Sequence, residues 1–209
     1  MKAFSYCIRG YLLGLAVFLT GCAIKPDMPQ LEEIYSPAQI QSFTAEGKIA
    51  FIRGKDRESV NFYWQQQQQN YHISLNTFLG IQVADIEGFT PPKRVASKQL
   101  PAHIKIEADG ETYQSNAPEQ LLEQVIGWPI PINKVANWAK GYHEGVIMSR
   151  HDDGSAKKVF VRTQFDQEWR LEYLSYHTLG HIKLPKKVKC QYLDFTLIMQ
   201  INEWKEINQ

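Results

Sequence analysis

The feature of this sequence that most constrains its fold is a series of short segments in which apolar and polar residues alternate. Side chains of a β-strand point alternately to the two faces of a sheet, so a period of two predicts strands with one buried face. Turn-forming residues at 54–57, 108–110 and 152–154 separate some of these segments, which favours antiparallel hairpins. The predicted strands are 43–53, 59–65, 71–76, 83–87, 103–107, 111–113, 158–162, 169–173, 187–192 and 194–201.

Two segments between the predicted strands have the three-to-four-residue period of a helix. Residues 117–127 end in Gly127, and residues 132–140 follow a link that Pro129 and Pro131 keep extended. About ten strands exceed what one flat sheet holds without curling. The predicted fold is therefore mainly β (α+β), with a curved antiparallel sheet that forms an incomplete β-barrel. Helices are expected to cover its open, concave side around a hydrophobic cavity.

The first residues have the pattern of a secretory signal. Two positive charges precede an apolar run at 11–20, which is shorter than the roughly 20 residues that a membrane-spanning helix needs. Leu19-Thr20-Gly21-Cys22 closes this run and resembles the lipobox of bacterial lipoproteins. That resemblance implies cleavage after Gly21, a diacylglycerol on the Cys22 thiol and an acyl group on the new amino terminus. An ordinary cleaved signal with a chance cysteine, or a short membrane anchor, is the alternative.

The rest of the chain is long enough for one domain. Residues 1–21 are predicted to be a lipoprotein signal peptide, 22–35 a lipidated tether, and 36–209 a single domain. A short helix over 37–43, with a serine N-cap and a proline at its first position, is expected to open this domain.

The net charge and the cysteines limit the classes of function that the chain can have. The formal net charge is only +1, and the signal removes two positive residues, so the mature chain lacks the basic excess typical of nucleic-acid binding. Cys7 leaves with the signal and Cys22 carries the lipid, so Cys190 has no partner for a disulfide. We expect Cys190 to be a small buried apolar residue.

No common catalytic or nucleotide-binding motif is present in the sequence, which predicts that the protein is not an enzyme. His177 and His181 have the spacing of helix-borne metal ligands, but Gly180 and Pro185 favour a loop there, so no metal is expected. The segments His143-Glu144 and Asp152-Asp153 are interpreted as solvated loop and turn residues.

An apolar segment, Thr77-Phe78-Leu79-Gly80-Ile81, falls where two predicted strands should be joined by a loop. Loop tips are normally polar, so an apolar tip indicates contact with a membrane or a partner. The alternative is that Phe78 and Leu79 fold back into the core.

Several motifs occur in an order that resembles the LolB family of outer-membrane lipoprotein receptors, and the similarity covers nearly the whole mature chain. These motifs are Gly47-Lys48-Ile49-Ala50, Asn61-Phe62-Tyr63-Trp64-Gln65-Gln66, Leu79-Gly80, Gly127-Trp128-Pro129-Ile130-Pro131, Trp138-Ala139-Lys140-Gly141, Trp169-Arg170-Leu171-Glu172-Tyr173, Leu184-Pro185-Lys186-Lys187-Val188 and Ile201-Asn202-Glu203-Trp204.

The resemblance implies a protein that accepts lipoproteins by their acyl chains from the periplasmic carrier LolA. It then inserts them into the inner leaflet of the outer membrane, acting as a chaperone in protein transport, without nucleotide or cofactor. The expected partners are LolA, lipoprotein cargo and outer-membrane phospholipid, with no nucleic acid, and the protein is expected to be monomeric. It would be anchored to the periplasmic face of the outer membrane by the palmitate-type lipid on Cys22. The resemblance also implies that Leu79, next to Phe78, assists membrane insertion.

Strand parity and the two helical faces suggest which side chains line the acyl cavity, although each could equally be ordinary core. The candidates are Phe62, Trp64, Leu75, Leu122, Val125, Ile126, Trp128, Val135 and Trp138.

Two features depart from the family pattern. Phe78 stands where many relatives have proline, and the proline-rich, basic segment 89–101 is longer than the corresponding family hairpin. Ala23 is not the aspartate that marks inner-membrane retention, which agrees with delivery to the outer membrane. A structural lipoprotein of an outer-membrane assembly complex, without an acyl cavity, is the alternative function, and a periplasmic hydrolase is a third.

Overall fold

The computed structural model describes residues 36–91, 101–163 and 166–209. The predicted signal and tether, and most of the proline-rich segment, lie outside these residues. Among the helices of the described chain, none has the length and apolar character needed to span a membrane.

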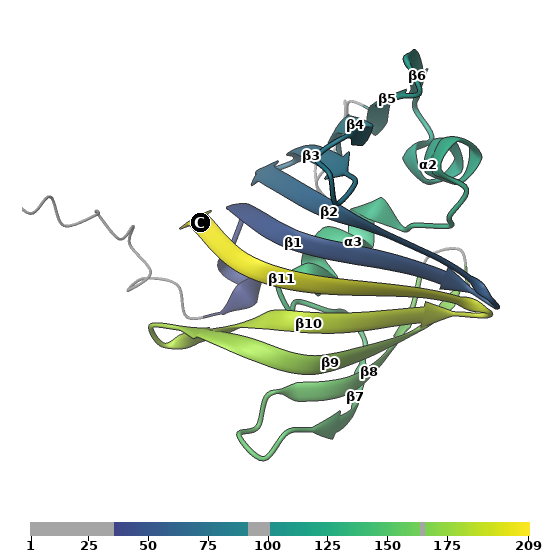
Figure 1. Cartoon of the computed structure of the whole chain (residues 1–209). Coiled ribbons are helices and arrows are strands. Elements are labelled where there is room, and N and C mark those ends of the chain that lie inside the picture. The colour runs from purple at the N-terminus through teal and green to yellow at the C-terminus, as the bar shows by residue number, and fades with distance from the viewer. Residues whose placement is uncertain (1–35, 92–100, 164–165) are drawn as a thin grey trace, which may run out of the picture.

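One antiparallel sheet of eleven strands organises the described chain, in the spatial order β6-β5-β4-β3-β2-β1-β11-β10-β9-β8-β7 (Figure 1). The strands are β1 (Ser42–Arg53), β2 (Asp56–Gln67), β3 (Asn70–Asn76), β4 (Gln82–Phe89), β5 (His103–Ala108), β6 (Glu111–Ser115), β7 (Val146–Arg150), β8 (Ala156–Arg162), β9 (Glu168–Leu179), β10 (Ile182–Tyr192) and β11 (Phe195–Asn208).

The sheet curves strongly but stays open, because β6 and β7 are its two edges and do not pair with each other. The chain between these edges forms α2 (Pro118–Ile126) and α3 (Ile132–Ala139). This segment has to carry the chain from one edge of the sheet to the other, and it does so along the concave side. The predicted fold class, a curved and incompletely closed antiparallel sheet with two helices, is therefore confirmed.

Each helix begins and ends for local reasons. The first turn of α2 contains a proline, which needs no hydrogen-bond acceptor there, and Gly127 ends the helix at a φ of 83°. The predicted first helix is a 3-10 helix, η3 (Pro37–Gln39), with Ser36 as its N-cap. It is shorter than the predicted range 37–43, because β1 already begins at Ser42.

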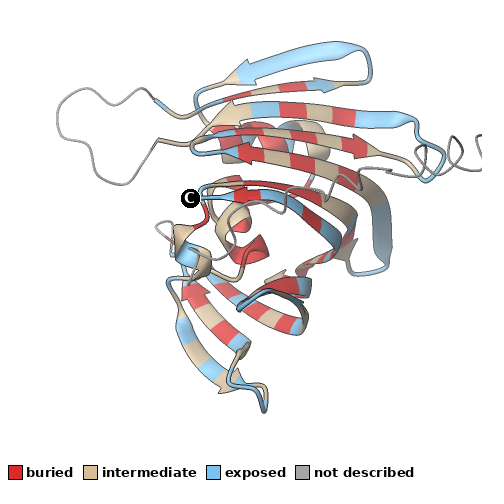
Figure 2. Ribbon diagram, turned by 90° about the vertical axis from the view of Figure 1, so that its left-hand side faces the viewer, coloured by how far each residue is buried: buried red, intermediate tan, exposed pale blue. Residues whose placement is uncertain are grey.

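The concave face of the sheet and the inner sides of both helices form one apolar core. Burial alternates along the strands, which is visible as red bands in Figure 2. The buried apolar residues of the described chain run from Ile40 to Ile207. A fragment comprising residues 23–209 therefore retains this whole core, and we expect it to fold without the signal peptide.

Two expectations about the strands were wrong. Strand β7 was missed, because Val146, Ile147 and Met148 are consecutive apolar residues at an exposed edge and do not alternate. The loop predicted around His177 and Pro185 is instead the end of β9 and the start of β10, and only the Gly180-His181 turn separates them.

Proline is tolerated inside β10 because the pairing of β10 with β9 is irregular there. The register shifts between Pro185 and Lys187, so the strand does not need a backbone N–H at the proline. The Pro185 carbonyl accepts a hydrogen bond of 3.1 Å from Trp204 Nε1.

Candidate functional site

Several aromatic rings of the concave interior have polar atoms that are hydrogen-bonded. Trp64 is 2% exposed, and its Nε1 donates to Gln66 Oε1 at 3.2 Å. Trp138 packs against Trp169 with ring centroids 5.3 Å apart. The Trp138 carbonyl accepts a hydrogen bond from the Tyr173 hydroxyl at 3.2 Å. With these groups paired, the rings present apolar surface to the interior.

Trp128 closes the interior near the β1–β2 hairpin. It stacks between Phe51 and Phe195, at centroid distances of 5.8 and 5.5 Å. Its Nε1 donates to Glu58 Oε2 at 3.3 Å, and the Arg53 guanidinium lies 5.2 Å from its ring centroid. Trp128 is therefore held from several sides at the point where the chain leaves α2.

All nine predicted cavity residues belong to this apolar cluster. Seven are buried, whereas Val125 and Ile126 on α2 are half-buried and pack against it. Strand parity was right for Phe62, Trp64 and Leu75, which all point inward. Side chains fill the interior in this structure, so a role in holding acyl chains stays a prediction for each residue.

Three adjoining hollows of about 240, 270 and 190 Å³ lie along α3 and the start of α2. They share lining residues and form one groove, which we call the mouth; it is lined by Tyr71, Thr90, Glu119, Asn133, Asn137 and Thr163, among others. Trp64 and Ile132 form part of its floor, so the mouth adjoins the apolar interior. Burial in the mouth raises the pKa of Glu119, and Lys134 opposes this shift.

The loop Thr77–Ile81 joins β3 to β4 and displays its apolar side chains to solvent. Phe78 is 84% exposed and Leu79 is 78% exposed, so the alternative in which they fold into the core is wrong. The loop is held by its own backbone: Thr77 N donates to Ile81 O at 2.8 Å, and Gly80 N donates to Thr77 O at 3.0 Å. This arrangement fixes the apolar tip in an outward position.

Lys140 was missed by the sequence interpretation. It follows α3, where a lysine is expected to interact with the helix C-terminus in solvent. Instead it is 8% exposed, and its Nζ donates to the carbonyl of Ile40. Burial lowers the pKa of Lys140 to about 8.

The remaining titratable candidates have structural roles in the described chain. Cys190 is fully buried, and burial raises the pKa of its thiol. His177 Nε2 lies 2.9 Å from the Ile201 carbonyl, and the structure places His181 in a turn rather than beside it in a metal site.

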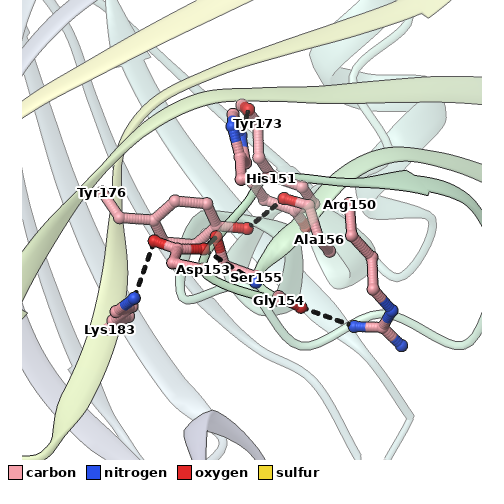
Figure 3. A network of polar contacts seen from close by, with 9 residues as sticks. All are labelled: Arg150, His151, Asp153, Gly154, Ser155, Ala156, Tyr173, Tyr176 and Lys183. Atoms are coloured by element: carbon pink, nitrogen blue, oxygen red, sulfur yellow. Dashed lines mark hydrogen bonds and ion pairs between the residues drawn. The ribbon is translucent and has the colours of Figure 1, made fainter.

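A polar network ties the β7–β8 hairpin to β9 and β10 (Figure 3). Asp153 accepts from Lys183 Nζ at 2.7 Å and from Ser155 N at 2.9 Å, and these contacts hold the pKa of its carboxyl well below the usual range. Tyr176 donates to the Ala156 carbonyl at 2.6 Å. The turn interpretation of Asp153 is therefore confirmed, and its role is to fix an edge hairpin.

Half-buried or exposed polar groups on β3 and β4 form a second cluster. His72 Nε2 lies 2.8 Å from Asp85 Oδ1, and Ser74 donates to Asp85 Oδ2 at 2.7 Å. Glu87 is close enough to complete a three-ligand set. The Asp85 carboxylate is already paired on both oxygens, so we interpret this cluster as a cross-strand contact.

The comparisons with known proteins agree with one another. A family model described as "Outer membrane lipoprotein LolB" matches residues 41–204. A protein named Outer-membrane lipoprotein LolB from Shewanella oneidensis is 30% identical over 212 residues, which cover 100% of this chain and 92% of that protein. One of the same name from Psychromonas ingrahamii is 26% identical over 210 residues, 98% of this chain and 96% of that protein.

A crystal structure of a LolA superfamily protein from Nitrosomonas europaea superimposes with a TM-score of 0.49 and 8% sequence identity. The match covers 79% of this chain and 86% of that chain.

Proposed function

Because the chain belongs to the LolB family of outer-membrane lipoproteins, we propose that it accepts lipoproteins from the periplasmic carrier LolA and inserts them into the inner leaflet of the outer membrane. The family assignment itself makes the protein a lipid-anchored outer-membrane lipoprotein that acts in lipoprotein localisation and is not an enzyme. The anchor in this proposal is the lipid on Cys22.

The observation that carries the proposal is an apolar concave interior covered by two helices that follow one another in the chain. An acyl chain gains about 0.8 kcal/mol for each CH₂ group removed from water, so an apolar interior that opens to a chain can bind it. Transfer from the carrier needs no nucleotide if the receptor binds the chains more tightly than the carrier does. The direction of transfer then follows from the difference in affinity.

Acyl chains enter this interior only if the covering segment moves, because side chains fill it. The link between the helices suits such a movement. Gly127 adopts a left-handed conformation with open space around it, and Pro129 and Pro131 stiffen the link that follows. In the described chain the main strand contacts of α2 are with the outer strands β5 and β6, so it can lift while the centre of the sheet stays intact.

Release into the membrane is assigned to the loop Thr77–Ile81. Phe78, Leu79 and Ile81 are all mostly exposed, and burying such a side chain in hydrocarbon stabilises by about 1.5–3 kcal/mol. The loop joins the ends of β3 and β4 that lie away from Tyr71 and Thr90 in the mouth, so it brings that end of the domain to the membrane surface.

The test is displacement of a fluorescent acyl probe from the 23–209 fragment. We expect saturable binding, competition by a lipidated peptide, and transfer of a lipoprotein from its LolA complex to the fragment. Failure of the probe to bind would favour the alternative of a structural lipoprotein without an acyl site. Turnover of an ester probe would favour the hydrolase alternative.

A further inference from the structure

Two residues that line the mouth carry a buried hydroxyl group with no hydrogen-bond partner among the described residues. Tyr71 is 5% exposed and Thr163 is 8% exposed, and both Tyr71 Oη and Thr163 Oγ1 are unpaired. Folded proteins leave few buried polar groups unpaired, because each loses its hydrogen bonds to water. Two such hydroxyls on one groove indicate that the groove is built to receive acceptor atoms.

The position of the Tyr71 hydroxyl depends on a glycine in the neighbouring strand. Tyr71 on β3 pairs directly with Gly88 on β4, and a Cβ at Gly88 would lie 2.2 Å from Tyr71 Oη. The ring therefore occupies the space that a side chain would fill. Burial, with a smaller contribution from Glu119, raises the pKa of Tyr71, so the hydroxyl keeps its proton and remains a donor.

Thr163 follows β8, so it reaches the mouth from the other half of the sheet. Its backbone is fully used: Thr163 N donates to Gln167 O at 2.9 Å, and Thr163 O accepts from Asp166 N at 3.1 Å. These bonds fix the residue, and only its side-chain hydroxyl is left without a partner among the described residues.

The rest of the mouth favours a neutral ligand over a phosphate. Lys134 is a positively charged residue that lines the mouth, and its Nζ forms an ion pair with Glu144 Oε2 at 3.0 Å. Asn133 and Asn137 contribute neutral amides, and Asn133 already accepts from the Thr90 hydroxyl at 2.7 Å. Neutral donors beside an apolar interior suit the ester and amide carbonyls from which acyl chains hang.

We propose that Tyr71 and Thr163 form a polar subsite that donates hydrogen bonds to the ester and amide carbonyls of an acylated glyceryl-cysteine, at the level where its chains enter the interior. This inference rests on the proposed function and deepens it by naming the part of the cargo lipid that the mouth recognises. Phospholipids carry the same glycerol esters, so the experiment includes both lipids.

The test uses Tyr71→Phe and Thr163→Val in the 23–209 fragment, since each change removes a hydroxyl with little change of shape. Three ligands are titrated: an alkyl probe without ester or amide, an N-palmitoyl, S-dipalmitoylglyceryl-cysteine peptide, and monomeric short-chain phosphatidylglycerol. We expect each variant to bind the alkyl probe as the parent does and the lipopeptide about fivefold more weakly, as loss of one neutral hydrogen bond predicts. Equal losses for phosphatidylglycerol place the bonds on the esters, and losses for the lipopeptide alone place them on the amide.

Thermal unfolding separates this role from a structural one. Without ligand, removing an unpaired buried hydroxyl should leave the melting temperature unchanged or raise it. Tyr176→Phe is the matched control, because that hydroxyl is bonded to the Ala156 carbonyl; it should lower the melting temperature and leave lipopeptide binding unchanged. Unchanged lipopeptide affinity in both mouth variants overturns the subsite while the proposed function stands. A parent fragment that binds none of the ligands overturns both.

Discussion

The buried Nζ of Lys140 donates to the backbone carbonyl of Ile40, 100 residues earlier in the chain. This contact joins the end of α3 to the segment that leads into β1. Among the described residues, the ammonium also lies 6.0 Å from the centroid of the Tyr142 ring. The cation is therefore held inside the domain at the base of the helical cover.

Lys140→Met should change how stability depends on pH. The folded-state pKa of Lys140 is about 8 and the ordinary value is 10.5, so the unfolded chain binds more protons between these values. The free energy of unfolding of the parent should therefore rise with pH in this window relative to the variant, by at most about 1.4 kcal/mol per pH unit. Urea unfolding of both proteins at pH 7, 8.5 and 10 measures the difference. Tyrosines and Cys190 titrate in both proteins and cancel, and parallel curves would show that Lys140 is not desolvated.

Leu79→Glu should separate release from uptake. A carboxylate at the tip of the loop is costly to place in hydrocarbon, and the variant also loses the burial of a leucine, about 1.5–3 kcal/mol. Release of bound lipoprotein into liposomes should slow about tenfold or more, while uptake from LolA stays unchanged. Leu193→Glu is the matched control, since this leucine is 84% exposed at a different turn. Equal effects of the two variants would remove the special role of the Thr77–Ile81 loop.

Cys190 should be inert to thiol reagents in the native fragment. It is the only cysteine in residues 23–209, it is fully buried, and its raised pKa keeps the thiol protonated at neutral pH. Ellman's reagent should titrate less than a tenth of the thiol in native buffer within an hour, and all of it in urea. Fast labelling of native protein would mean that the β9–β11 part of the core opens readily.

Gly47→Ala should destabilise the centre of the sheet. A Cβ at this position would lie 2.0 Å from the Gln200 carbonyl oxygen, at the bulge where β1 meets β11. We expect a loss of about 1–3 kcal/mol in the free energy of unfolding, as for other overpacked sites. Gly110→Ala is the comparison, because no atom lies near its Cβ position and only its φ of 79° opposes the change. A larger loss in Gly110→Ala would contradict the proposed clash.

Much of the fold could be predicted because burial imposes a period on the sequence. The alternation was clear in β2 and β3, where one face meets the core, and Gly127 marked the end of α2. The prediction failed where a strand leaves the core. The second half of β9 is mostly half-buried on both faces, so its residues up to Leu179 carry no alternation to detect.

Less of the candidate site than of the fold could be predicted from the sequence. The aromatic residues of the interior could be assigned from strand parity, and the apolar loop from its composition. Tyr71 and Lys140 could not, because their environments depend on distant residues, Gly88 for one and Ile40 for the other. No local sequence pattern indicates which distant glycine or carbonyl a side chain will contact.

The pairing of β1 with β11 also determines when the protein can fold. Each half of the sheet is built from hairpins between neighbouring segments, but its centre joins Ser42 to Asn208. Contacts between such distant segments form slowly, because a long loop must close first. The central pair cannot assemble until the last strand has been made. The centre of the sheet therefore forms only when both ends of the domain are present.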